Sequence, residues 1–164
     1  MESNMNSSLI SMNADLIQNI VKDEVLSCNA ITATYGVTLT EEQALALVNT
    51  RGEALKKTGR MEWCGGVLQK LIMAFCDSPY ITEDNYEETL HELTELFYGF
   101  KNETLEVVTD DQLIGFMKSA FNGRCCGALE LLAGRELMEL AWHIHRGHSF
   151  ESFKDTKEGN YDQA

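Results

Sequence analysis

The sequence predicts an all-α protein folded as a compact, mainly antiparallel bundle of about six helices. Three observations support this prediction. Apolar residues recur at helical spacing in several segments, helix-start and helix-stop signals alternate along the chain, and no segment alternates apolar and polar residues long enough to indicate a strand. The expected helices cover residues 13–35, 40–58, 66–76, 82–102, 109–121 and 127–146.

Capping signals define the starts of three of these helices. Thr40 and Thr109 are each followed three residues later by a glutamine, the pattern of a capping box in which side chains satisfy the first free backbone N–H groups. Thr82 begins the helix between them, and two acidic residues follow it. Because acidic side chains interact favourably with the positive end of a helix dipole, all three positions are predicted helix N-termini.

Glycines mark the predicted ends of the helices, and apolar stripes mark their predicted buried faces. Gly36, Gly59 and Gly147 each follow a predicted helix and act as C-terminal caps. Two helices have clear apolar stripes: Tyr86, Leu90, Leu93, Phe97 and Phe100 in one, and Leu129, Leu132, Leu137, Leu140 and Ile144 in the other. Stripes of this kind face a hydrophobic core, and neither indicates a cofactor site.

Length and composition indicate one ordinary folded domain. The chain has 164 residues, 44% of them hydrophobic, and a single proline, which is typical of a globular protein with one core. We expect a single helical domain over 13–148, a flexible N-terminus over 1–12 and a polar C-terminal tail over 149–164. Phe150 and Phe153 offer the alternative that the tail docks on the bundle.

The net charge of −13 limits the classes of partner. Between residues 81 and 111 ten acidic residues accompany a single basic one, Lys101. A surface of this sign repels nucleic acids and anionic membranes, so neither is expected as a partner. The helix 82–102 therefore carries either a solvated acidic face or a docking surface for a basic partner.

The chain shows no targeting signal and predicts a cytoplasmic protein. Its N-terminal residues lack the basic and apolar regions of a signal peptide, and no stretch approaches 18 consecutive apolar residues. Five cysteines, at positions 28, 64, 76, 125 and 126, form no CxxC pair and are expected to be reduced thiols. No catalytic motif, metal site or cofactor site is predicted.

Two similar segments are candidate binding sites. "CGGVLQKL" starts at Cys64 and "CCGALELL" at Cys125, and both are expected at helix starts. A thiol at a helix N-terminus has a lowered pKa, and glycines there let the backbone approach a small anion. The candidate residues are Cys64, Gly65, Gly66, Arg124, Cys125, Cys126 and Gly127. They form either a thiol-based metal, redox or small-anion site, or only small buried residues at helix starts.

Trp63 is the candidate anchor of a protein interface, because tryptophan beside a glycine turn is typical of such anchors; a core position is the alternative. The sequence thus favours a non-catalytic protein-interaction or accessory module that binds another protein or itself. Its expected surfaces are the acidic helix 82–102 and the turns around Trp63 and Arg124. The competing hypothesis is the thiol-based site described above.

Three stretches carry a resemblance to a known family: "AFCDSPYI", "FYGFKNETL" and "DDQLIGFMK". On these stretches the segment from Gly59 to Gly134 resembles a family of small bacterial proteins that is defined only as a domain of unknown function. The resemblance implies an origin in anaerobic low-GC Gram-positive bacteria. It implies no activity and transfers no functional residue.

Overall fold

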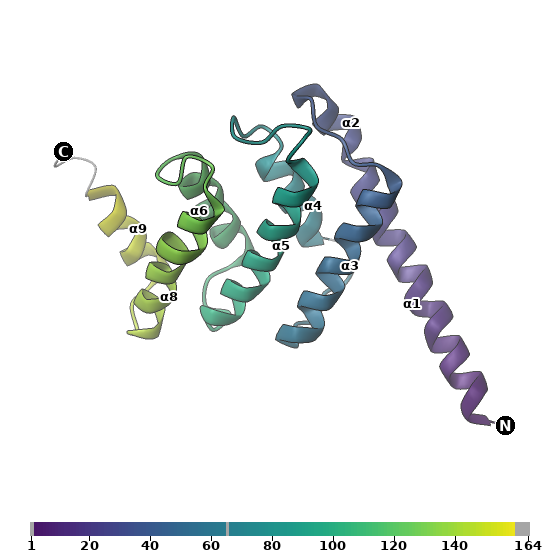
Figure 1. Ribbon diagram of the computed structural model, residues 1–164. Helices are drawn as coiled ribbons and strands as arrows, with labels where there is room; N and C mark the ends of the chain where they lie inside the picture. Colours follow the sequence, from purple (N-terminus) through teal and green to yellow (C-terminus); the bar gives the residue numbers. More distant parts are fainter. Residues whose placement is uncertain (1, 65, 160–164) are drawn as a thin grey trace. The chain divides into compact units, whose positions relative to one another are not determined.

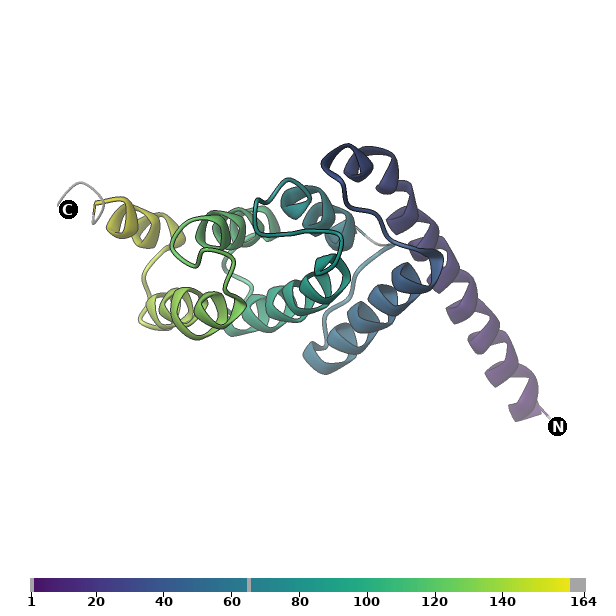
Figure 2. The ribbon, with the colours of Figure 1, turned by 45° about the horizontal axis from the view of Figure 1, so that its top comes forward.

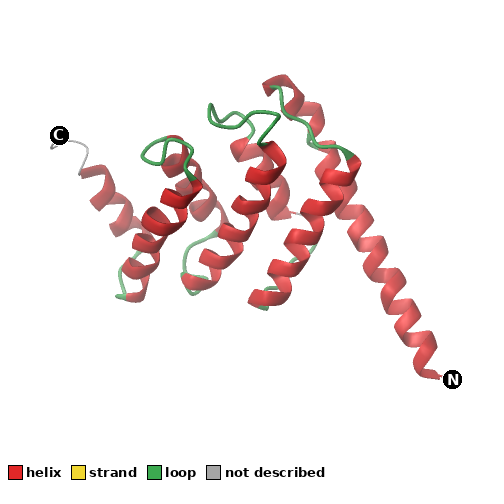
Figure 3. Ribbon diagram, in the orientation of Figure 1, coloured by secondary structure: helices red, strands yellow, loops and turns green. Residues whose placement is uncertain are grey.

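The computed structural model describes residues 2–64 and 66–159 (Figure 1). Over these residues the secondary structure consists of helices and loops without a strand, which confirms the predicted all-α fold (Figure 3). None of the described helices is long and apolar enough to span a membrane. The chain divides into two compact units, Met1–Thr94 and Glu95–Ala164, and the boundary falls within one helix. The single domain over 13–148 stays a prediction.

The first unit is built on a long N-terminal helix. Its elements are α1 (Glu2–Ser27), α2 (Asn29–Thr32), the 3-10 helix η1 (Ala33–Tyr35), α3 (Glu41–Thr58), α4 (Gly66–Phe75) and the first half of α5 (Tyr86–Glu103). In Figure 1 α1 lies beside α3. The two helices run antiparallel, since Gln18 bonds to Asn49 and Lys22 pairs with Glu41 at 2.8 Å.

Two predicted starts in this unit differ from the structure. Helix α1 begins at Glu2 and not at residue 13, because the chain has no glycine or proline before Gly36 to interrupt a helix. The flexible N-terminus over 1–12 stays a prediction. Helix α5 begins at Tyr86 and not at Thr82. The side chain of Asn85 accepts the backbone N–H of Thr82 at 2.9 Å, and this bond closes a turn ahead of the helix.

The second unit is organised around a helical segment that changes its pitch. It contains the rest of α5, then α6 (Asp110–Asn122), α7 (Leu129–Leu131), the π-helix η2 (Leu132–Leu137), α8 (Met138–His145) and α9 (Phe150–Gly159). Figure 2 shows this α7–η2–α8 segment with α9 folded back next to it. The segment begins two residues later than predicted, because Cys126 and Gly127 have positive φ angles of 47° and 80° that no α-helix accepts.

A helix also replaces most of the predicted polar tail. The side chain of Ser149 accepts the backbone N–H of Ser152 at 3.1 Å and caps the start of α9. Phe153 is buried, and its ring lies 5.4 Å from the ring of Phe116 in an edge-to-face arrangement. The alternative expectation for this segment, docking through a phenylalanine, is therefore what the structure shows.

Both capping boxes predicted from the sequence are present. Thr40 and Thr109 accept the backbone N–H groups of Gln43 and Gln112, and each glutamine side chain accepts the threonine N–H in return. We expect Thr40→Ala and Thr109→Ala each to lower the free energy of unfolding by about 1 kcal/mol, because each leaves a helix N-terminus with an unsatisfied donor. Urea denaturation measures this loss. Serine at the same position retains the hydroxyl and should restore most of the stability, so equal losses for serine and alanine would contradict the capping role.

Candidate functional site

The loop between α3 and α4 exposes apolar side chains and buries charged ones. Trp63 is 89% exposed and Met61 is 84% exposed. The side chain of Glu62, between them in sequence, is only 8% exposed. Because large apolar residues ordinarily lie inside and carboxylates outside, this loop inverts the usual distribution. It is the strongest candidate interaction element of the first unit.

Glu62 holds the loop in this arrangement through two ion pairs. Its Oε1 atom accepts the Nε–H of Arg51 at 3.2 Å, and its Oε2 atom accepts the Nε–H of Arg60 at 3.0 Å. Arg51 is buried on α3 and also donates to the backbone carbonyl of Cys64. The loop is thus fixed on both sides of Trp63 by buried, charge-assisted hydrogen bonds.

The candidate residues Cys64, Gly65 and Gly66 follow Trp63 directly in the sequence. Cys64 is exposed and adopts a positive φ of 57°, which a non-glycine residue adopts at an energetic cost. Gly66 is the first residue of α4, and Gly65 lies outside the described residues. The Cys64 carbonyl is engaged by Arg51, so what the structure shows for this residue is a backbone role in fixing the loop.

The second predicted helix start, Cys125 to Gly127, lies at a helix end instead. The backbone N–H of Cys125 donates to the carbonyl of Ala120 at 2.9 Å, and that of Gly127 donates to the carbonyl of Phe121 at 2.8 Å. These amides therefore satisfy the last carbonyls of α6. Since the donors are already used, the backbone of this turn does not form the anion cradle considered from the sequence.

The two thiols of this turn have opposite environments. Cys125 is buried, and burial raises its pKa, with a further increase from the nearby Glu136 carboxylate. The thiol of Cys125 is therefore buried in the turn that ends α6 and does not lie at the helix N-terminus expected from the sequence. Cys126 is exposed, and its thiol lies 3.4 Å from the carbonyl oxygen of Gly123. Cys64 belongs to the first unit.

Metal-ligand geometry is not found in the part of the chain that the structure describes. No group of three or more histidine, cysteine, aspartate or glutamate side chains there could hold a metal ion. The soft-metal version of the thiol hypothesis thus receives no support from the placement of the described cysteines.

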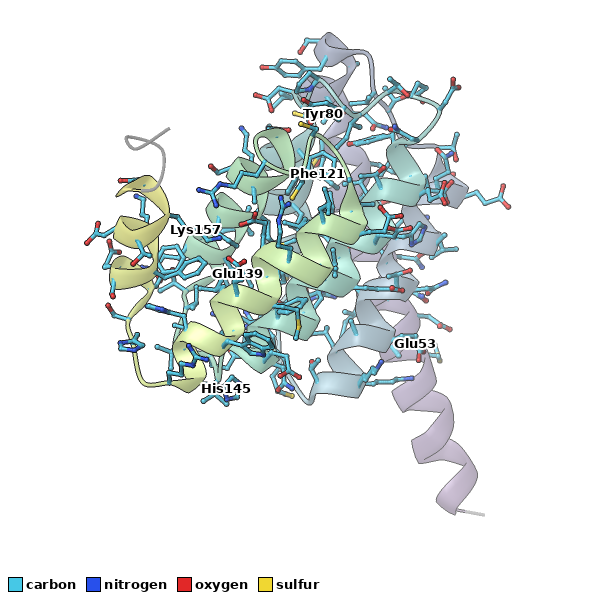
Figure 4. The ribbon with its side chains drawn as sticks, turned by 60° about the vertical axis from the view of Figure 1, so that its left-hand side comes forward. Glu53, Tyr80, Phe121, Glu139, His145 and Lys157 are labelled. Atoms are coloured by element: carbon cyan, nitrogen blue, oxygen red, sulfur yellow. The ribbon has the colours of Figure 1, made fainter. Side chains whose placement is uncertain are left out.

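Glu136 is a buried charge that the analysis of sequence motifs did not identify. It lies in the π-helix η2 and is 2% exposed. Its Oε1 atom accepts the Nε–H of Arg135 at 3.1 Å, and its Oε2 atom lies 3.3 Å from the Lys157 ammonium of α9. Lys157 also pairs with Glu139 of α8, and Figure 4 shows these two side chains reaching toward each other. π-Helices are frequent at functional sites, so this network marks a second candidate region.

The imidazole of His143, on α8, also contacts α9. The ring of His143 lies 5.3 Å from the ring of Phe153 and 4.7 Å from that of His148. Its Nε2 atom is buried and has no hydrogen-bond partner among the described residues. Burial lowers the pKa of His143, and the neighbouring His148 lowers it further. The folded protein therefore favours the neutral form of this imidazole.

A comparison with known protein families finds a match over most of the chain. The sequence profile of the family of unknown function DUF6323 matches residues 24–150. The chain belongs to this family. The match extends beyond the segment 59–134 on which the resemblance was seen, and it includes the Trp63 loop, the turn after α6 and Glu136. No curated protein and no solved structure matches the chain.

The sequence of this chain contains a periodic signal that indicates Glu136. Leu132, Glu136, Leu140 and Ile144 follow one another at intervals of four, so the glutamate occupies a position of an apolar stripe. A charged residue at such a position is buried and must be paired. Arg135 is adjacent in sequence, but Lys157 lies on another helix and no local pattern predicts that contact.

The environments of the two adjacent cysteines predict different reactivities. We expect iodoacetamide at pH 7.5 to modify Cys125 more slowly than a free cysteine, because burial both covers the thiol and raises its pKa. Cys126 is the matched comparison, because it lies in the same turn and is exposed. Tandem mass spectrometry of the time course separates the two sites. Equal modification rates would contradict the environment described for Cys125.

The lowered pKa of His143 makes stability depend on pH. In the unfolded chain the imidazole has its ordinary pKa of 6.5, and in the folded protein its pKa is lower. The contribution of neutral His143 is therefore complete above pH 6.5 and decreases as pH falls below that value, because the unfolded state binds the proton more tightly. Urea denaturation between pH 5 and pH 8 measures the slope.

His143→Gln should flatten this dependence, whereas His145→Gln, a change at an exposed histidine of the same helix, should not. If both variants retained the slope of the unmodified protein, its source would lie elsewhere.

Proposed function

We propose that this protein is a non-catalytic interaction module of the bacterial cytoplasm that docks on a partner protein through Met61 and Trp63. The observation that carries the proposal is the loop that exposes these two side chains while a buried carboxylate and two arginines fix its backbone. Tryptophan is enriched among the residues that dominate binding energy at interfaces. A loop whose backbone and side chains are already held by hydrogen bonds loses less conformational entropy on binding than an unconstrained loop, which favours affinity.

The charge around the loop supports a particular kind of partner. Residues 51–70 contain five basic and two acidic residues in a chain whose net charge is −13. Lys56 and Lys57 are exposed at the end of α3, next to the loop. The complementary partner has an apolar pocket for Trp63 and an acidic rim around it. A second copy of this chain offers acidic residues on α5, so self-association is one outcome to be tested.

Photo-cross-linking identifies the partner. Trp63 is replaced by p-benzoylphenylalanine, and the protein is irradiated in the cells that produce it. The matched control carries the same probe at Trp142, which is 59% exposed on α8. We expect an adduct with one defined protein from position 63 and not from position 142. An adduct of twice the chain's mass identifies a second copy as the partner.

The affinity of the identified partner then tests the role of the tryptophan. We expect Trp63→Ala to weaken binding by roughly thirtyfold, the effect of losing a central aromatic anchor, in isothermal titration calorimetry. Trp142→Ala should leave the affinity within about twofold, as expected for a residue outside the interface. Equal affinities of the two variants would show that the Met61–Trp63 loop is not the docking element.

A further inference from the structure

The second unit contains an open groove between α6 and α9. Its volume is about 590 Å³, within the range of pockets that hold small molecules and therefore large enough for an indole ring. Gln112 donates to Glu151 near one end of the groove, and Arg124 donates to the backbone carbonyl of Lys157 near the other. These bonds hold the two helices beside each other and so fix the width of the groove.

The floor of the groove is apolar. Phe116 of α6 and Phe150 of α9 line it, and both are only partly buried. A Cβ atom added at the neighbouring Gly115 would meet no atom within 4 Å, so the space in front of this face of α6 is open. Aromatic rings pack favourably against another aromatic ring or against a thioether. The groove therefore offers two rings to an apolar occupant.

The walls of the groove are acidic on balance. Its lining contains four carboxylates and three cations, and one of these cations, Lys157, already pairs with Glu136 and Glu139. The exposed charged side chains of α9 are three acidic ones and one basic one: Glu151, Asp155 and Glu158, and Lys154. An occupant with an apolar centre and basic residues around it is therefore complementary to the groove in both respects.

The Met61–Trp63 loop of the first unit has these two properties. Trp63 is 89% exposed and Met61 is 84% exposed. Lys56 and Lys57 are exposed at the end of α3 next to the loop, whereas the side chain of Glu62, the acidic residue of the loop, is only 8% exposed. The surface that the loop offers to a partner is therefore apolar at its centre and basic at its edge.

Each copy of the chain thus carries an exposed apolar loop and an open apolar groove, with opposite charges around them. Large exposed apolar side chains and apolar grooves both mark sites of interaction. A protein with an apolar protrusion and a pocket complementary to it elsewhere on its surface makes heterologous contacts with its own copies. One occupant, a second copy, then explains both uncovered surfaces.

We infer that the partner of the Met61–Trp63 loop is a second copy of this chain, and that Trp63 inserts into the groove between α6 and α9 of that copy. The indole lies against Phe116 and Phe150, and the lysines at the end of α3 face the carboxylates of α9. The inference rests on the docking role proposed for the loop and adds the surface that receives it. Arg124, a candidate from the sequence, contributes by joining the end of α6 to α9.

Sedimentation velocity of the full-length protein over a hundredfold range of concentration measures self-association. Two variants block the two sides of the contact. Trp63→Ala removes the indole, and Gly115→Leu fills the groove from an exposed position of α6, where leucine also favours the helix over glycine. The matched controls are Trp142→Ala, at an exposed tryptophan of α8, and Gly134→Leu, at an exposed glycine of η2 that does not line the groove.

We expect the average mass of the unmodified protein and of both controls to rise with concentration, and each blocking variant to associate at least tenfold more weakly. A mixture of Trp63→Ala with Gly115→Leu should regain a complex of twice the chain's mass, because the first variant keeps an open groove and the second keeps its tryptophan. A contact between two identical loops would not recover in this way. A mixture that stays monomeric would therefore overturn the inference.

The outcomes separate this inference from the docking role of the loop. If the unmodified protein stays monomeric while position 63 cross-links to a different protein in cells, the second copy is not the partner and the docking role stands. Self-association that is lost in Gly115→Leu but kept in Trp63→Ala would reject the loop as the occupant of the groove. The absence of any adduct from position 63 would reject the docking role as well.

Discussion

The pairing of buried carboxylates is the constraint on which both units depend. An unpaired carboxylate inside a protein costs several kcal/mol of stability, so each one requires cations at fixed positions. Glu62 in the first unit and Glu136 in the second solve this problem in the same way, because each carboxylate oxygen pairs with a different cation. Replacing a buried ion-pair network by apolar residues is often neutral for stability. The contribution of these two networks therefore lies in the positions that they fix for neighbouring segments.

The two networks position different kinds of surface. Glu62 draws the charged residues of a loop inward, and the apolar residues that alternate with them face water. Glu136 draws Lys157 of α9 onto the π-helix, and α9 then forms one wall of a groove. An exposed tryptophan is suited to contact with a macromolecule, and an open groove is suited to contact with a group the size of a small molecule. The inferred self-association joins these two surfaces, and separate variants test each of them.

Patterns of neighbouring residues in the sequence correctly predicted those helix starts that depend only on neighbouring residues. The capping boxes at Thr40 and Thr109 depend on residues three positions apart, and both are present as predicted. The turn at Cys125 to Gly127 was assigned to the wrong helix, because glycines and small residues occur both where helices start and where they end. The contact of Glu136 with Lys157 and that of Phe153 with Phe116 each join two different helices, and no local pattern predicts such a partner. The inward direction of Glu62 is non-local for the same reason, since Arg51 is eleven positions away.

The π-helix also explains an irregularity in the apolar stripe of its segment. Leu132 and Leu137 are five positions apart, a spacing that an α-helix would place on different faces, and both are fully buried. A π-turn closes its hydrogen bonds over five residues, so it brings these two positions back to the same side. The number of residues between them is therefore as constrained as their chemistry. With one residue fewer, the same two leucines would fit an ordinary α-helix at a spacing of four, and the later side chains would keep their faces, so the extra residue and the wider pitch belong together.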